Sequence, residues 1–317
     1  MEQRQTNTKI AGIDVGKSRL DGAVRGLEDT VQVGNAPTGF SELIAWLKAR
    51  EVGRVGLEAT GGYERGVRQA LEAEGFEVVV HQPIEVRRFA QMKRWRAKTD
   101  RLDAQLIAAA TAQVEAVRAA QDPRLQALAE RLTVYEQITD QAAQLKTFLE
   151  HVTLADLTKA VRAQIQALTA LKARLAAEIL KAIKAHDDLA ARYRLLISLP
   201  GFGPIVAATH VIRMPELGQM RRGQAAALIG VAPFARDSGQ YKGQRFIGGG
   251  RRRPRRMLYL AALAAKRWDP GHRAFAEALI ARGKPPKLVI VAIMRKLVEA
   301  ANLVLSRGQP WRPQPTA

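Results

Sequence analysis

The chain has 317 residues, of which 47% are hydrophobic, enough to bury the cores of two domains and a connector. Its 50 Lys and Arg residues outnumber its 30 Asp and Glu residues, and the formal net charge of +20 indicates a polyanionic partner. The absence of cysteine excludes disulfides and thiolate zinc sites and suits a reducing cytoplasm. No run of 18 apolar residues offers a transmembrane helix, so we expect no membrane association.

The first third of the chain alternates short apolar runs with amphipathic helical patterns. Strands are expected over 9–15, 20–25, 30–33, 53–58 and 76–80. Helices are expected over 38–49, 63–74, 84–91 and 100–113, the first of them capped by Thr38. The resulting order β-β-β-α-β-α-β-α predicts an α/β domain with the topology of ribonuclease-H-like nucleases.

Four acidic residues lie where a metal-dependent nuclease needs them. Asp14 and Glu58 each close an apolar strand, and a carboxylate there is costly without a partner. Asp100 and Asp103 are three residues apart, so they share one helix face. Helix capping is the ordinary explanation for that pair alone, but the four acids together predict a site for one or two Mg²⁺ ions. The segment 12–18 lacks the spacing of a Walker A loop, so no nucleotide cofactor is expected.

The remainder of the chain is predicted to be helical. Apolar residues recur every three or four positions over 122–190, with a break near 153–156. This pattern predicts two long helices that fold back as a hairpin or pair with another chain, and ordinary core packing satisfies it equally well. Further helices are expected over 223–230, 254–268, 271–282 and 285–306. The segment 199–204 has the composition of a helix-hairpin-helix turn that approaches phosphate, or of a simple tight turn.

Two basic stretches are predicted to contact a nucleic-acid backbone, because long runs without acids favour a polyanion. Their members are Arg87, Arg88, Lys93, Arg94, Arg96 and Lys98 in the first stretch, and Lys242, Arg245, Arg251, Arg252, Arg253, Arg255 and Arg256 in the second. Phe89 and Trp95 lie within the first stretch and offer stacking surfaces for bases.

Several motifs together resemble one known family. They are Gly12-Ile13-Asp14-Val15, Gly56-Leu57-Glu58-Ala59-Thr60-Gly61, Lys98-Thr99-Asp100-Arg101-Leu102-Asp103-Ala104, Leu199-Pro200-Gly201-Phe202-Gly203-Pro204, and Gly230-Val231-Ala232-Pro233 followed by Ser238-Gly239. Their order and spacing resemble the DEDD transposases of bacterial insertion sequences, the "one-ten" family of bridge-RNA-guided recombinases. The resemblance covers most of the chain.

The resemblance implies three parts. They are a RuvC-like catalytic domain over 1–115, a helical coiled-coil connector over 116–190, and a mostly α C-terminal transposase domain over 191–317 with the helix-hairpin-helix-like segment. It also implies that Asp14, Glu58, Asp100 and Asp103 bind Mg²⁺, and that Ser238 becomes covalently linked to DNA. The implied partners are donor and target DNA, a noncoding bridge RNA, and a second copy of the chain in a homodimer that assembles to a tetramer.

The leading hypothesis is therefore a DNA transposase or recombinase that acts in the bacterial cytoplasm through a Ser–DNA intermediate. A hydrolytic RuvC-like Holliday-junction nuclease with water as nucleophile is the first alternative. A non-catalytic nucleic-acid-binding protein, in which the acids are only caps and strand-end polar groups, is the second.

Overall fold

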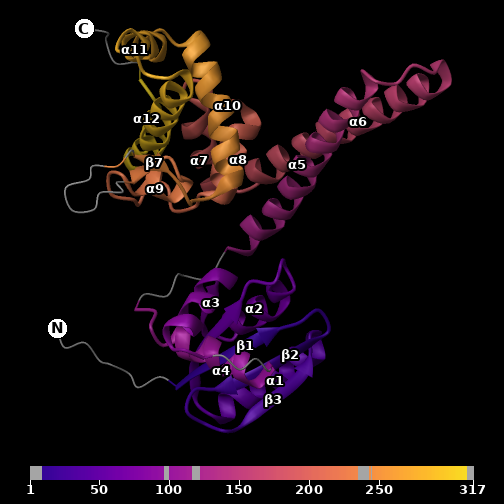
Figure 1. The fold of residues 1–317 in the computed structure, drawn as a ribbon, viewed down its shortest axis with the longest axis vertical. Helices are drawn as coiled ribbons and strands as arrows, with labels where there is room; N and C mark the ends of the chain where they lie inside the picture. Colours follow the sequence, from indigo (N-terminus) through magenta and orange to yellow (C-terminus); the bar gives the residue numbers. More distant parts are fainter. Residues whose placement is uncertain (1–8, 96–99, 116–121, 235–242, 244, 313–317) are drawn as a thin grey trace. The chain divides into compact units, whose positions relative to one another are not determined.

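The computed structural model describes residues 9–95, 100–115, 122–234, 243 and 245–312, and for Asp100 and Arg101 only the backbone. The chain divides into two compact units, Met1–Gln121 and Asp122–Ala317 (Figure 1). The first unit is a mixed α/β fold with a five-stranded sheet, and the second is largely helical. No helix within these described ranges is long and apolar enough to span a membrane.

The sheet of the first unit has the strand order β3-β2-β1-β4-β5. Its strands are β1 (Lys9–Val15), β2 (Arg19–Val24), β3 (Thr30–Gly34), β4 (Val52–Glu58) and β5 (Glu77–His81). The first three strands form an antiparallel meander, whereas β4 and β5 run parallel to β1. The two strands that carry Asp14 and Glu58 near their ends are neighbours, because β1 pairs directly with β4.

The two faces of this sheet are covered differently. Helices α1 (Pro37–Ala49) and α2 (Glu64–Ala73) pack on one face of the sheet. Their apolar residues form a core there with strand residues such as Ile13 and Leu57. Helix α4 (Asp100–Thr111) lies against the other face, next to α3 (Pro83–Met92). The sheet thus has a purely apolar side and a side that carries its polar residues.

One predicted cap is wrong. Thr38 lies inside the first turn of α1, which begins at Pro37 with Ala36 in the capping position and no side-chain cap. Proline is favoured at the first helical position because its missing N–H would have no partner there. The strong Pro signal at residue 37 therefore outweighs the capping preference of threonine.

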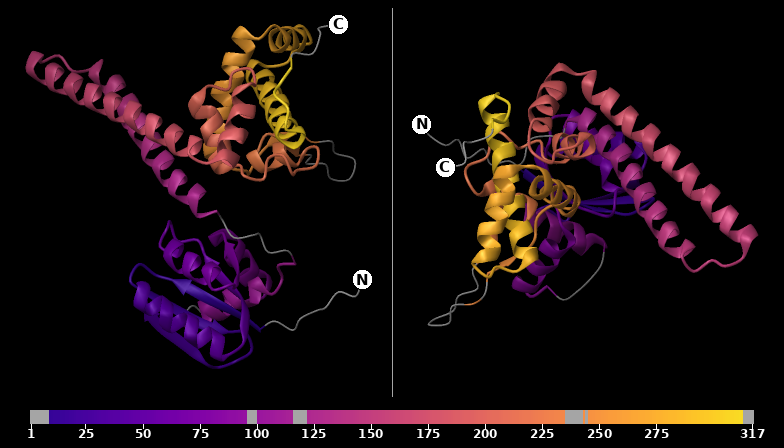
Figure 2. Two further views of the ribbon diagram at one scale, coloured as in Figure 1. Left: turned by 180° about the vertical axis from the view of Figure 1, so that it is seen from behind. Right: turned by 90° about the horizontal axis from the view of Figure 1, so that it is seen from above.

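The second unit begins with a helical hairpin, visible as the two long helices in Figures 1 and 2. Helix α5 (Pro123–Leu149) and helix α6 (Ala155–Lys184) pack along each other and are joined at 150–154, close to the predicted break. The base of the hairpin is part of the core of this unit through Leu128 and Leu132 of α5 and Ile179 and Ile183 of α6. Near its tip, by contrast, Phe148 and Leu154 are exposed.

The rest of the second unit is a cluster of helices around that core. Its elements are α7 (Asp187–Ile197), α8 (Pro204–Arg213), α9 (Gln224–Ile229), β6 (Pro233–Phe234), β7 (Phe246–Ile247), α10 (Arg252–Trp268), α11 (Pro270–Ala281) and α12 (Pro286–Arg307). The predicted helices are confirmed, whereas the two-residue strands β6 and β7 were not predicted. In the turn between α7 and α8, Gly201 has a positive φ of 76° and packs against the carbonyl oxygen of Ala261 in α10. The absence of a side chain at Gly201 therefore allows the α7–α8 turn to pack closely against α10.

Candidate active site and nucleic-acid-binding residues

One polar side chain from each strand lies in a row across the sheet. The row consists of Gln32, Asp21, Asp14, Glu58 and His81, from β3, β2, β1, β4 and β5 in that order. Gln32 pairs with Asp21, Asp21 with Asp14, and Glu58 with His81, while the parallel register of β1 and β4 places Asp14 next to Glu58. Residues that pair directly point to the same face of a sheet. Of this row, only Asp14 and Glu58 are among the site residues predicted from the sequence.

A row of small residues lies two positions earlier on the same face, and α4 is seated on it. A Cβ atom at Gly12 would come well within 3.0 Å of the backbone of Ala104 and Ala108. A Cβ atom at Gly56 would collide in the same way with the hydroxyl of Thr111. Because these contacts involve the helix backbone at Gly12, only glycine allows α4 to approach β1 this closely.

The orientation of α4 directs Asp103 toward the polar row. On one flank of the helix, Gln105 donates from Nε2 to the carbonyl oxygens of Val24 (3.2 Å) and Leu27 (2.8 Å). These carbonyls lie beyond the row of small residues, on the side away from Asp14. Asp103 is two residues from Gln105, which is a rotation of about 200° around the helix. Asp103 is therefore on the opposite flank, the one nearer the acids of the sheet.

His81 links the end of the polar row to α4. Its Nε2 is 2.8 Å from Oγ1 of Thr111, and that hydroxyl donates its proton to the carbonyl oxygen of Ile107 at 2.7 Å. Since the hydroxyl has a single proton, we assign His81 Nε2–H as the donor. Burial lowers the pKa of His81, although Glu85 opposes this shift. The neutral ring thus fixes the end of β5, next to Glu58, to the helix that carries Asp103.

The donor set of this region is suited to a hard divalent cation. Asp14, Glu58 and Asp103 offer carboxylate oxygens, the ligands that Mg²⁺ prefers in proteins. Within the described part of the chain, no three His, Cys, Asp or Glu residues are close enough to hold a metal ion. The side chain of Asp100 lies outside the described residues. The four-acid site therefore stays a prediction, with three of its members on facing surfaces of the sheet and α4.

The first basic stretch presents unpaired cations. Arg87, Arg88, Lys93 and Arg94 are exposed on α3 and just after it. None of these four makes an ion pair with any described residue, although Lys93 lies over the ring of Phe89 at 5.8 Å. Arg96 and Lys98 lie outside the described residues. The exposed cations of α3 are thus available to phosphate groups.

The second basic stretch is organised differently, because most of its described arginines already have partners in the chain. Arg251 donates to the Glu216 carboxylate and to the carbonyl oxygen of Arg213 at 2.7 Å. Arg255 donates to the carbonyl oxygens of Gly230 and Gly249, which fixes the segment before α10. These two arginines therefore stabilise the fold of the second unit.

Two further arginines of α10 hold the helical hairpin. Arg253 donates to Oε2 of Glu136 at 2.8 Å, and Arg256 donates to both carboxylate oxygens of Asp140. Glu136 also accepts from Arg213 at 3.2 Å. Burial raises the pKa of Glu136 in spite of the neighbouring arginines. A half-buried carboxylate thus joins α5 to α8 and α10.

The remaining arginine of this block, Arg252, is exposed and has no partner among the described residues. It lines a groove of about 560 Å³ together with Arg253, Arg255, Arg256, Tyr259, Ile247, Val291 and Met294. The groove combines cationic groups with an exposed aromatic ring, which suits a phosphodiester backbone and a stacked base. Arg245 directly precedes β7, and Lys242 and Ser238 are outside the described residues.

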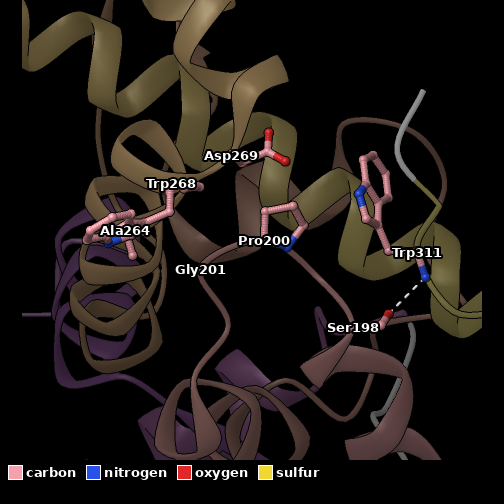
Figure 3. A pocket seen from close by; sticks show the side chains of 8 residues that line it. Ser198, Pro200, Gly201, Ala264, Trp268, Asp269 and Trp311 are labelled. Carbon is pink, nitrogen blue, oxygen red and sulfur yellow. Dashed lines mark hydrogen bonds between the residues drawn. The ribbon is translucent and has the colours of Figure 1, made fainter. Parts of the chain in front are cut away.

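A second pocket, of about 330 Å³, lies where the α7–α8 turn meets the end of α10 and the C-terminal segment (Figure 3). Its polar groups already have partners: Ser198 Oγ accepts from the backbone N–H of Trp311 at 2.8 Å and donates to the carbonyl oxygen of Leu195. Asp269 caps α11 by accepting from the backbone N–H of His272. No predicted site residue from the described ranges lines it, and its contacts anchor the C-terminal segment.

Carboxylates near the ends of two neighbouring strands and on a facing helix, joined in one chain to a cationic helical unit, define a class of enzymes that act on nucleic-acid phosphodiesters. Comparison with known families identifies the member of this class. Residues 11–154 match a DEDD family model described as "Transposase", and residues 193–277 match one described as "Transposase IS116/IS110/IS902 family". The chain belongs to the IS110 family of transposases, and the predicted resemblance is confirmed.

Two curated relatives are similar to almost the whole chain. Each is named "Pilin gene-inverting protein", one from Moraxella bovis and one from Moraxella lacunata. Both are 24% identical over 315 residues, which span 95% of this chain and 96% of the relative. The chain is accordingly an enzyme of DNA transposition and recombination, with DNA as its substrate.

Proposed function

We propose that this protein is the transposase of an insertion sequence that cuts and rejoins DNA strands through a covalent Ser238–DNA intermediate. The observation that carries the proposal is the placement of Asp14, Glu58 and Asp103 on facing surfaces of the sheet and α4, within a chain of the IS110 family. The order of the strands and the acids at the ends of β1 and β4 support a RuvC-like catalytic domain. The packing of α5 on α6 supports a coiled-coil connector.

Asp14, Glu58, Asp100 and Asp103 are the residues that would hold Mg²⁺, one ion or two. Bound there, the cation would neutralise charge on the reacting phosphate and favour departure of the leaving oxygen. The acids themselves repel a phosphodiester, so they cannot account for nucleic-acid affinity. The exposed cations of α3 and the α10 groove supply that attraction instead.

The strand-exchange step conserves the number of phosphodiester bonds. The Ser238 hydroxyl attacks phosphorus and loses its proton, a serine–phosphate bond forms, and one flanking phosphorus–sugar oxygen bond breaks. The freed sugar oxygen takes up a proton. Attack by a sugar hydroxyl of another strand on the serine–phosphate bond then reverses the sequence and releases Ser238. No external energy source is needed, because each broken bond is replaced by one of the same kind.

The relatives are named for the inversion of a pilin gene. For the present chain we propose recombination between donor and target DNA, specified by a noncoding bridge RNA that base-pairs with both. A homodimer that assembles to a tetramer would hold the two DNAs together. The strongly basic composition supports simultaneous engagement of RNA and DNA.

Strand cleavage by variants of the acids tests this proposal. Asp14→Ala and Asp103→Ala should each abolish Mg²⁺-dependent cleavage of DNA that carries the element's ends, while nucleic-acid affinity in a filter-binding assay stays within about twofold. The binding should persist because phosphate contacts lie on other residues. Undiminished cleavage by the double variant in Mg²⁺ would contradict the acidic site.

A further inference from the structure

Asp21 of β2 occupies a position that an ordinary sheet would not give to an acid. It pairs directly with Asp14 across the antiparallel β1–β2 register, on the face covered by α4. Its side chain is only 14% exposed. Like charges directly opposite each other on neighbouring strands destabilise a sheet. The chain nevertheless places two carboxylates in register beside Glu58.

The immediate contacts of Asp21 fix its carboxylate group in place. Its Oδ2 accepts from Nε of Arg19 at 3.1 Å, and its Oδ1 accepts from Nε2 of Gln32 at 2.6 Å. Each oxygen thus has a protein donor, and the group cannot rotate without losing one of them. These contacts leave Asp21 ill suited to replace Asp14 as a direct ligand. They suit a residue that acts on its neighbour through a fixed charge.

We infer that Asp21 is a positioning residue of the acidic site, whose fixed negative charge opposite Asp14 strengthens the attraction of that site for a divalent cation. The inference rests on the proposed function, because it concerns the same cation. A carboxylate held by outer hydrogen bonds near metal ligands commonly tunes their affinity. Because the Asp21 side chain is only 14% exposed, solvent would screen its attraction for a cation held by Asp14 less than it screens an exposed charge.

A purely structural role would consist of an ion pair with Arg19 within β2 and a link from β2 to β3 through Gln32. Asp29 is a suitable control for that role. It likewise forms an ion pair with an arginine, accepting from Nε of Arg50 at 2.7 Å. Asp29 lies in the loop before β3, outside the polar row, and its side chain is 48% exposed. Asp29→Asn therefore removes the same charge and the same kind of ion pair from the same unit.

Calorimetric titration of the full-length protein with Mn²⁺ or Mg²⁺, without nucleic acid, tests the inference. We expect Asp21→Asn to weaken cation binding about 5- to 10-fold, Asp21→Glu to weaken it less, and Asp29→Asn to leave it unchanged. In strand-cleavage assays the Asp21→Asn variant should regain its rate when the Mg²⁺ concentration is raised by the same factor. Melting curves of each variant establish that it is folded.

Two results would overturn the inference and separate it from the proposed function. Cation binding that is lost in Asp14→Asn but unchanged in Asp21→Asn would leave the metal site intact and refute the role of Asp21. An equal loss in Asp21→Asn and Asp29→Asn would show a general effect of charge and refute it as well. No saturable cation binding by the wild-type protein would refute the inference and the proposed acidic site together.

Discussion

Replacing Gly12 with alanine should displace the helix that carries Asp103. The added methyl group would lie well within 3.0 Å of the backbone of both Ala104 and Ala108. Backbone atoms cannot rotate away as the end of a flexible side chain can, so α4 itself must move off β1. Because Gly12 is two residues from Asp14 on the same strand face, that movement separates Asp103 from the acids of the sheet.

The expected loss of stability in Gly12→Ala is about 1–3 kcal/mol, the usual cost of forcing one extra methyl group into a close-packed contact. Hydrogen exchange of the α4 and β1 amides measures this loss within the first unit, independently of the helical unit. Strand cleavage should fall more than stability accounts for, since a displacement of about 1 Å at a catalytic group can cost about 100-fold in rate.

Gly34→Ala is the matched control. Gly34 also lies in the sheet, at the end of β3, but a Cβ atom there meets nothing within 4 Å. The free energy of unfolding of the Gly34→Ala variant should differ from that of the wild type by less than about 1 kcal/mol. Any change should be stabilising, because alanine has fewer conformations than glycine in the unfolded chain. Equal exchange protection of α4 in Gly12→Ala and the wild type would refute the argument that this glycine sets the position of the helix.

Two other predictions concern the helical unit. Arg251→Ala should lower the stability of this unit by about 1–2 kcal/mol in urea melts, because the Arg251–Glu216 ion pair is lost. Arg252→Ala should instead leave stability unchanged and flatten the salt dependence of nucleic-acid affinity by about 0.7–0.9 in log–log slope. The reverse pattern would show that the roles of the two arginines are exchanged. Burial lowers the pKa of His210 to about 4, so the native state keeps it neutral while the unfolded chain protonates it near 6.5. The contribution of the neutral His210 to the free energy of unfolding is therefore complete above pH 6.5 and is lost as the pH falls toward 4, by about 3 kcal/mol in total. Melts of His210→Leu between these pH values should lack this decline if burial of the histidine is its cause.

The sequence predicted the α/β unit well because its signals are local. Alternating apolar residues define the strands, and proline and glycine mark the ends of most helices. The acids Asp14 and Glu58 could be placed together because both end strands that a parallel arrangement makes neighbours. The same reasoning could have found Asp21, which lies seven residues after Asp14 across a short turn and therefore returns to the same level of the sheet.

The sequence could not predict which arginines of the second basic stretch form ion pairs within the chain. Run length and charge indicate a polyanion-binding surface, but Arg253 and Arg256 are paired with Glu136 and Asp140, more than 100 residues away in the chain. Only the tertiary fold, in which α5 and α10 both pack against α8, brings these charges together. Charge composition thus identified the stretch, whereas the tertiary fold decides which of its arginines, Arg252 foremost, is free for phosphate.

Mapping the protein–DNA adduct tests the central claim most directly. The wild-type protein, incubated with Mg²⁺, DNA that carries the element's ends and the flanking noncoding RNA, should yield a denaturation-resistant adduct whose nucleotide-modified peptide contains Ser238 by mass spectrometry. Ser238→Ala should lose the adduct and recombination while retaining nucleic-acid binding, and mixing it with Asp14→Ala should restore part of the activity if two chains share one site. An adduct that persists in Ser238→Ala, or strand cleavage by the wild type without any adduct, would contradict the serine intermediate and favour a hydrolytic junction nuclease.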